Sequence, residues 1–266
     1  MPDLRVPAAA PAADGTVAVV TPASAGWEHV GFEALVLAPG QAAERETGGR
    51  ECCVVVIGGR VHIGSEHGDW RDVGRRATPF AGAPDAAYLP PGTRFAVEGA
   101  GDGGEVGLCF APARDGAPAR LLPAGDVAPE ARGHGAHART VRPILMDGEP
   151  ADALLVCEVD TPPGHWSSYP PHKHDRDALP DESQLEETYF FRIDPPQGFG
   201  FLRVYDGAEL DETLAVRDRD TVLVPRGYHP VGVPPGYRSY YLNVMAGPRR
   251  IWRFRNDPAH EWMVKG

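Results

Sequence analysis

The sequence predicts an all-β protein, built as one large β domain or as two smaller barrels or sandwiches. Short apolar runs rich in valine, isoleucine and aromatic residues recur through the whole chain of 266 residues, as is typical of these architectures. The 32 glycines and 28 prolines bound the runs, and no convincing helical stretch competes with them. A chain of this length suits one large domain or two domains of about 130 residues each.

Each expected strand is a short apolar run that ends at the glycine or proline of a turn. In the first half we expect strands at 32–38 (FEALVLA), 51–59 (ECCVVVIGG), 60–64 (RVHIG), 86–92 (AAYLPPG), 94–99 (RFAVEG) and 105–113 (EVGLCFAPA). In the second half we expect them at 153–160 (ALLVCEVD), 187–194 (ETYFFRID), 198–207 (GFGFLRVYDG), 213–218 (TLAVRD), 220–227 (DTVLVPRG) and 239–247 (SYYLNVMAG).

The segment from Pro123 to Thr140 separates the two halves. It is low in large apolar residues and rich in alanine, glycine and proline, which is typical of a linker. A weak internal echo, YLPPGTRF in the first half and VLVPRGYHPV in the second, supports a duplication in which only the second copy has a histidine, His229. We therefore expect one domain over residues 1–135 and another over residues 136–266.

Charge and composition exclude some classes of protein. The formal net charge of −11 at pH 7 repels phosphate backbones, and no long cluster of lysine and arginine interrupts it. We therefore expect no nucleic-acid partner. The run MPDLRVPAAAPAADG at the N-terminus carries acids and prolines where a signal peptide needs a positive start, and no apolar run approaches a bilayer-spanning length. These features predict a cytoplasmic protein without a membrane partner.

The four cysteines, Cys52, Cys53, Cys109 and Cys157, show no CxxC spacing, and three of them lie in apolar, strand-like runs. Buried, reduced thiols are therefore the expected state. The lack of thiolate ligands also argues against a closed structural zinc site.

Histidines in the second half suggest a metal site. His172 and His174 flank Lys173 in the run SSYPPHKHD, and on a strand the two imidazoles would share one face while Lys173 points away. Glu187 opens the next strand-like run, and His229 follows a Pro-x-Gly turn. For the HxH motif alone, a polar surface turn is the more ordinary interpretation. With the glutamate and the third histidine added, a metal site becomes the favoured interpretation.

Three neutral imidazoles and one carboxylate suit zinc, manganese, iron, nickel or cobalt, and they leave positions open for a substrate. The set HKH, EETYFF and PRGYH resembles the two metal-binding motifs of the cupins, in which HxH and a glutamate come from one hairpin and a further histidine follows a PxG turn. The glutamate in that pattern is followed by one residue and then aromatics, which favours Glu187 over Glu186. The implied metal ligands are His172, His174, Glu187 and His229.

The match is closer to one family, the 5-deoxy-glucuronate isomerases of bacterial myo-inositol catabolism. The second half resembles that family through YPPHKHD, LPDESQLEETYFF, DPPQGFGFLRVYD, DTVLVPRGYHPVGVPPGY, YYLNVMAGPRRIW and NDPAHEWM. The first half resembles it more loosely, through GWEHVGFEALVLAPG, CCVVVIGG and RTVRPIL. The resemblance implies two tandem cupin barrels, each a double-stranded β-helix or jelly roll, with a metal site in the C-terminal barrel and none in the N-terminal one.

The resemblance also implies a metal-dependent aldose–ketose isomerase that converts 5-deoxy-D-glucuronate to 5-dehydro-2-deoxy-D-gluconate. One divalent ion, zinc or manganese before iron, nickel or cobalt, would polarise the carbonyl. A base must reach the C2 proton, and the carboxylate of the substrate needs a cation, preferably a guanidinium. The expected catalytic residues are Glu187, Tyr205 and Tyr241, the expected substrate-binding residues are Arg203, Arg142, Arg226 and Asn243, and the linker histidines His134 and His137 are expected to be solvated.

Three alternatives remain open. A sugar-acid isomerase with another substrate, or a cupin dioxygenase with ferrous iron, could use the same ligands. A non-catalytic sugar-binding bicupin could keep the fold without the reaction. In each case a sugar acid is the expected partner, and paired β barrels can associate through sheet edges into a homo-oligomer.

Overall fold

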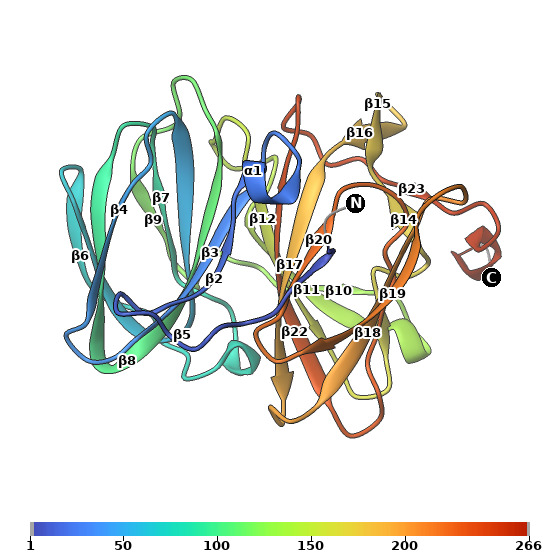
Figure 1. Cartoon of the computed structure of the whole chain (residues 1–266), viewed down its shortest axis with the longest axis horizontal. Coiled ribbons are helices and arrows are strands. Elements are labelled where there is room, and N and C mark those ends of the chain that lie inside the picture. Colours follow the sequence, from blue (N-terminus) through green and yellow to red (C-terminus); the bar gives the residue numbers. More distant parts are fainter. Residues whose placement is uncertain (1–2, 265–266) are drawn as a thin grey trace.

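Extended backbone dominates this protein because its apolar runs are rich in β-branched and aromatic side chains, which pack well on a pleated surface. The computed structural model describes residues 3–264 and shows two β barrels side by side (Figure 1). The predicted all-β class is confirmed, although residues 1–2 and 265–266 of the predicted domains lie outside the described range. Helical structure within that range is limited to α1 (Pro22–Ala25), η1 (Pro79–Ala81), η2 (Gly135–His137) and η3 (Glu261–Val264).

The first barrel is a single eight-stranded sheet. Its strands are β2 (Thr16–Val20), β3 (Gly31–Leu37), β4 (Ala42–Glu46), β5 (Arg50–Ser65), β6 (Gly68–Val73), β7 (Ala86–Leu89), β8 (Arg94–Pro112) and β9 (Arg120–Leu122). The long strands β5 and β8 pair along their whole length, and the beginning of β8 also pairs with β4 while its end pairs with β3. The sheet therefore folds over on itself and encloses an apolar core of its own.

The second barrel consists of a seven-stranded sheet, a four-stranded sheet and two short strand pairs. In spatial order the seven-stranded sheet contains β1 (Arg5–Val6), β20 (Thr221–Val224), β17 (Glu186–Asp194), β22 (Arg238–Ala246), β12 (Leu155–Thr161), β11 (Arg139–Leu145) and β10 (Glu130–Arg132). The four-stranded sheet contains β13 (Trp166–Ser167), β21 (Val231–Gly232), β18 (Phe199–Tyr205) and β19 (Asp211–Arg217). The short pairs are β14 (His172–Lys173) with β23 (Arg255–Asn256), and β15 (Asp175–Ala178) with β16 (Glu182–Gln184).

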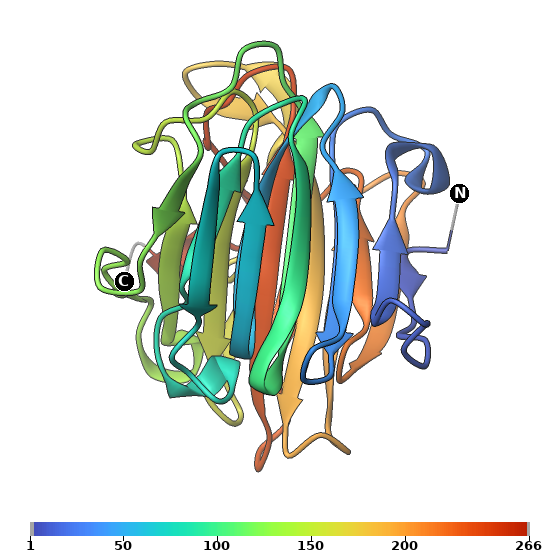
Figure 2. The same cartoon turned by 90° about the vertical axis from the view of Figure 1, so that its left-hand side faces the viewer.

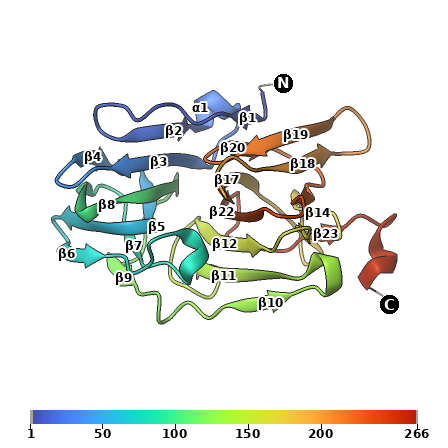
Figure 3. The ribbon, with the colours of Figure 1, turned by 90° about the horizontal axis from the view of Figure 1, so that it is seen from below.

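Two segments that the sequence assigns to the first domain belong to the sheet of the second barrel. Arg5 and Val6 pair with Val222 and Thr221, so the start of the chain lies among the strands of the other barrel (Figure 1). Strand β10 pairs with β11, and Figure 3 shows β10, β11 and β12 side by side. The expected linker is thus partly strand and helix, and the domain division at residues 135 and 136 stays a prediction that these pairings do not favour.

The seven-stranded sheet is the wall of the second barrel that faces the first barrel. In Figure 2, which looks from the side of the first barrel, its strands lie behind those of the eight-stranded sheet. One face packs on the first barrel, where the rings of Phe32 and Phe190 are 5.4 Å apart. Gly107 is required at this contact, because a Cβ atom there would lie 2.6 Å from Cδ2 of Leu242. The other face points into the second barrel. Side chains alternate between these two environments along each strand.

A buried charge network joins the barrels. Arg76 of the first barrel makes two hydrogen bonds, of 2.6 and 2.8 Å, to the carboxylate of Glu158 on β12. Arg142 of β11 donates to the same carboxylate at 3.1 Å, and the hydroxyl of Tyr240 donates to it at 3.0 Å. The fully buried Glu158 is therefore compensated by donors from both barrels, as a buried charge requires.

Two expectations drawn from the composition concern the cysteines and membrane-spanning segments. The four cysteines are free and buried, and burial raises the pKa of each thiol, which confirms the prediction of buried, reduced residues. Within residues 3–264, no helix is both long enough and apolar enough to cross a membrane.

Candidate metal centre

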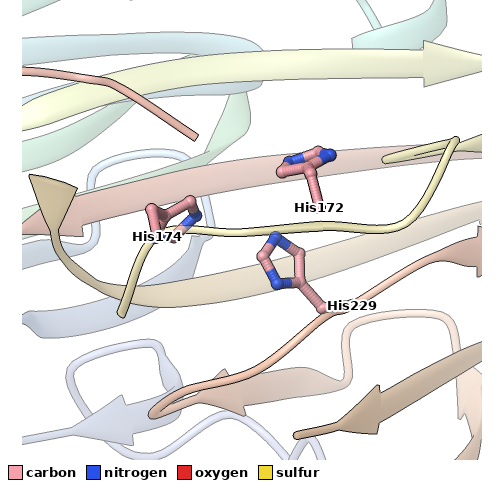
Figure 4. A group of neighbouring side chains, drawn as sticks. All are labelled: His172, His174 and His229. Atoms are coloured by element: carbon pink, nitrogen blue, oxygen red, sulfur yellow. The ribbon is translucent and has the colours of Figure 1, made fainter. Parts of the chain in front are cut away.

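The three expected histidines come together inside the second barrel. His172 lies on β14 and His174 follows it, so their rings project to the same side, while Nζ of Lys173 binds Glu182 at 2.7 Å on the other side. His229 arrives from the turn after β20. The ligand atoms of the three imidazoles all lie within 4.8 Å of one another, and Figure 4 shows the rings gathered from two separate stretches of chain.

The turn before His229 requires glycine. Gly227 has a φ angle of +87°, and a Cβ atom there would lie 2.5 Å from the carbonyl oxygen of Tyr205. This left-handed conformation, which glycine adopts without steric cost, turns the chain back into the barrel. The Pro-x-Gly motif thereby directs the ring of His229 inward, where it is fully buried.

Glu187 lies beside two of these three histidines. Its Oε2 atom lies 3.1 Å from Nε2 of His174 and 3.3 Å from Nε2 of His229. Glu186, the preceding residue on β17, points the opposite way, and its carboxylate accepts hydrogen bonds from the backbone N–H groups of His29 and Val30 at 2.7 and 2.9 Å. The expected opposite orientations of the two acids are therefore observed, as strand alternation requires.

The donor set fits a cation. Nδ1 of His229 lies 2.9 Å from the carbonyl oxygen of Gly227, and Nδ1 of His174 lies 3.3 Å from that of Leu185. Such contacts hold the imidazole hydrogen on Nδ1 and leave the Nε2 lone pair free for a ligand. Nε2 of His229 is buried without a hydrogen-bond partner. The Nε2 lone pair of His229 and one carboxylate oxygen of Glu187 thus face each other, an arrangement that a bound metal ion would stabilise.

The protonation states agree with this interpretation. Burial, together with repulsion from His229 and His174, lowers the pKa of His172 well below its ordinary value. Burial likewise lowers the pKa of His229 to about 4. At His174 burial acts in the same direction, but the hydrogen bond and the charge of Glu187 outweigh it and raise the pKa. Two of the rings are therefore neutral and available as ligands at neutral pH, and the carboxylate attracts a positive charge to the third.

A cavity of about 400 Å³ lies beside the cluster and reaches His172 and Glu187. This volume is within the usual range for small-molecule sites. The inward face of the seven-stranded sheet forms one wall, with Cys157, Val159, Tyr189, Tyr241, Asn243 and Met245. The segment between the barrels and the C-terminal region form the other, with Arg132, His134, His137, Arg139, Trp252 and Phe254.

Tyr241 and Asn243, which share one face of β22, both line this cavity. The hydroxyl of Tyr241 lies 3.4 Å from Oγ of Ser168, which in turn lies 3.0 Å from the hydroxyl of Tyr189. Burial raises the pKa of Tyr241 to about 12. Tyr241 is consequently a neutral hydrogen-bond donor at physiological pH.

Neither Tyr205 nor Arg203 lines the cavity, so their expected roles stay predictions that this placement does not favour. The hydroxyl of Tyr205 donates to Asp257 at 2.7 Å, and Arg203 is paired with Asp211 at 2.7 and 2.8 Å on the exposed face of β18. The intervening Val204 is fully buried. Alternation along β18 was therefore correct, but the apolar side chains take the inward face and the polar pair takes the outer one.

Arg142 and Arg226 are also placed outside the cavity. Arg142 faces the first barrel and pairs with Glu158 and, at 3.5 Å, with Asp160. Arg226 pairs with Asp206 at 2.9 Å and lines a separate surface hollow. Both guanidinium groups are held by carboxylates of the protein itself, so the expected role in substrate binding stays a prediction that these contacts do not favour.

The residues that the sequence interpretation missed belong to the expected linker. Arg132, His134, His137 and Arg139 line the cavity. Of the two histidines that were expected to be solvated, His134 is exposed and His137 is partly buried. Arg139 and Arg142 stand on opposite faces of β11 because they are three residues apart. The run RTVRPIL contains this alternation, but only the packing of the first barrel decides which arginine faces the site.

The fold and the site define the class of this protein: it is a bicupin, and the histidine cluster supports a metal ion in its second barrel. The chain belongs to the KduI/IolB family, whose family model matches residues 4–263. Among curated proteins it is 49% identical over 267 residues to the 5-deoxy-glucuronate isomerase of Geobacillus kaustophilus, covering 100% of this chain and 96% of that one.

Solved structures agree with the family and the fold. An IolB-like protein from Salmonella typhimurium LT2 is 40% identical, with a TM-score of 0.95 over 98% of this chain and 99% of that chain. The formate complex of an oxalate decarboxylase from Lactobacillus farciminis has a TM-score of 0.67 over 99% of this chain and 90% of that one, at 15% identity. The similarity to the oxalate decarboxylase is a similarity of fold only.

Proposed function

We propose that this chain is a 5-deoxy-glucuronate isomerase, which converts 5-deoxy-D-glucuronate to 5-dehydro-2-deoxy-D-gluconate in myo-inositol catabolism. The observation that carries the proposal is the convergence of three imidazoles and the Glu187 carboxylate beside a cavity of about 400 Å³. The full-length relationship to curated proteins of that name supports the choice of substrate. An aldose–ketose isomerase needs a polarised carbonyl and a nearby base, and the cavity offers candidates for both.

His172, His174, His229 and Glu187 would hold one divalent ion. Such an ion supplies Lewis-acid chemistry, which polarises the carbonyl and acidifies the neighbouring C–H bond. Zinc or manganese is our first choice, and iron, nickel or cobalt suit the same donor set.

Glu187 is the proposed base. Its Oε2 atom faces the two imidazoles, whereas no hydrogen bond to Oε1 occurs in the described part of the chain. Oε1 is therefore available to take the proton from C2 and return it to C1. Tyr241 remains protonated because its pKa is about 12, so it donates a hydrogen bond to a substrate oxygen and does not act as the base. Asn243 offers an amide on the same wall.

The decisive experiment combines metal analysis with product analysis. The purified protein is stripped with a chelator, each of the five candidate metals is added back singly, and ketose formation from 5-deoxy-D-glucuronate is followed without oxygen. We expect about one bound ion per chain, no turnover after stripping, and recovery with at least one metal. Full turnover after complete stripping, or no conversion with any metal, would exclude the proposal.

The same experiment separates the alternatives. A dioxygenase with this site would need ferrous iron and oxygen, so anaerobic turnover with zinc or manganese excludes it. A non-catalytic sugar-binding bicupin would bind the acid and leave it unchanged. An isomerase of another sugar acid would turn over that compound with a larger kcat/KM than 5-deoxy-D-glucuronate.

A cytoplasmic location and a homo-oligomer complete the proposal. Support for association comes from an apolar patch on the outer sheet, where Trp166, Phe199 and Phe201 are 43%, 40% and 44% exposed. Trp166 and Phe201 are neighbours, since both pair with Gly232. Exposed aromatic patches of this kind mark association sites. Sedimentation of wild type and Phe201→Ser tests this: a monomeric wild type would refute the oligomer.

A further inference from the structure

A positively charged side chain without a carboxylate partner lies in the cavity wall. Arg139 is half-buried, and its Nη1 atom donates to the backbone carbonyl of His137 at 3.1 Å. Within residues 3–264 no carboxylate lies within ion-pairing distance of it. By contrast, Arg142 on the same strand pairs with Glu158, and Arg132 in the same cavity pairs with Glu130 at 2.6 Å. Arg139 is thus the cavity arginine whose charge the protein leaves uncompensated.

The lack of a carboxylate partner for the Arg139 guanidinium has an energetic cost. Burial and the nearby charge of Arg132 lower the pKa of Arg139, which means that the charged form is less favourable here than in water. A buried or half-buried charge is normally paired. Among residues 3–264, Glu187 is the single carboxylate in the cavity wall, and it already faces His174 and His229. The cavity therefore has an unmet requirement for an anion, in a protein whose formal net charge is −11.

The position of Arg139 suits an anion that also reaches the histidine cluster. Strand alternation directs Arg139 and Val141 into the cavity and Arg142 toward the first barrel, in agreement with their contacts. Arg139 and His172 line the same cavity of about 400 Å³. One small molecule in the cavity can contact both.

We propose that Arg139 is the specificity residue of this site, and that its guanidinium binds the carboxylate of the substrate while the carbonyl end faces His172 and Glu187. The inference rests on the proposed function and identifies the substrate class: a straight-chain aldose or ketose with a terminal carboxylate. A planar guanidinium binds a carboxylate through two parallel hydrogen bonds, which a lysine cannot reproduce. Binding at both ends holds the reacting carbon atoms in place.

The test uses the metal-loaded protein and two substrates, 5-deoxy-D-glucuronate and 5-deoxy-D-glucose, which carries a hydroxymethyl group instead of the carboxylate. In Arg139→Gln we expect kcat/KM for the acid to fall by about 100-fold, the usual scale for a hydrogen bond to a charged group. For the neutral sugar we expect little change. The inhibition constant of 5-deoxy-D-glucose, measured against turnover of the acid, should also be the same in the wild type and in Arg139→Gln. This measurement does not need the neutral sugar to be converted.

Two further variants are controls. Arg71→Gln removes an exposed arginine of the first barrel, outside the cavity, and should leave both substrates unaffected. Arg139→Lys keeps the charge and should lose part of the preference for the acid. Equal losses for both substrates in a folded, metal-loaded Arg139→Gln protein would overturn the role of Arg139 and leave the proposed function standing. A wild-type protein that converts no 5-deoxy-D-glucuronate would instead refute the proposed function itself.

Discussion

Nε2 of His229 and Oε2 of Glu187 lie 3.3 Å apart with no hydrogen between them, because the imidazole hydrogen points to the carbonyl oxygen of Gly227 on the other side of the ring. Two acceptors in contact inside a barrel repel each other unless a cation lies near both. His174 also approaches Oε2, at 3.1 Å, and there the carboxylate raises the pKa of the imidazole and favours its positive charge. The cluster is arranged for a ligand with positive charge.

Loss of one imidazole should therefore release the ion. In His229→Ala we expect metal affinity to fall by on the order of 100-fold or more, a loss at least as large as that caused by changing residues that only orient ligands. Turnover should be lost with the metal. Metal content after dialysis and the rate of isomerisation check this, with His67→Ala, an exposed histidine of the first barrel, as the control. Normal metal content in His229→Ala would rule out the ligand set.

The buried charge network should contribute strongly to stability. Glu158→Gln leaves Arg76 and Arg142 without their shared carboxylate, and breaking a buried pair costs about 3–5 kcal/mol. The free energy of unfolding from denaturant titration measures this loss. Glu149→Gln, whose partner Arg120 is 3.7 Å away on the surface, should cost less than about 1 kcal/mol. Equal effects of the two changes would show that the network does not hold the barrels together.

The contact between the barrels should not accept a side chain at Gly107. A Cβ atom there meets Leu242 at 2.6 Å and Phe32 at 3.1 Å, and both neighbours are fully buried. We expect Gly107→Val to destabilise the fold by about 1–3 kcal/mol through overpacking. The melting temperature reports the change. Gly49→Ala is the control because no atom lies within 4 Å of its Cβ position, and a similar loss there would contradict the explanation.

Acid should remove the contribution of Asp206. The hydrogen bond from Arg226 and those from the backbone of Leu210 and Ala208 lower its pKa from 3.8 to about 2. A depressed carboxyl pKa means that the stabilisation is complete above pH 3.8 and disappears as the pH falls through about 2. Asp206→Asn should therefore lower the free energy of unfolding by about 1 kcal/mol at pH 6, after allowance for solvent screening. Well below pH 2 the two proteins should be equally stable, and a pH-independent difference would disprove the assignment.

Much of the fold follows from local patterns in the sequence. Runs such as ETYFFRID become strands because β-branched and aromatic side chains suit an extended, half-buried backbone. The pairing of Arg5 and Val6 with Thr221 and Val222 was not predictable, because a two-residue strand has no periodicity to detect. Part of the expected linker likewise forms strand β10, which pairs with the nearby β11, and a strand of three residues is also too short to show a periodicity.

The sequence by itself determined which residues share a face: His172 with His174, Tyr241 with Asn243, and Glu187 opposite Glu186. This follows from the two-residue period of a strand, which is a property of the backbone. Only the tertiary structure decided which face is inside. Packing of the first barrel against the seven-stranded sheet turned Arg142 away from the cavity and Arg139 into it, because each face takes its environment from what packs against it.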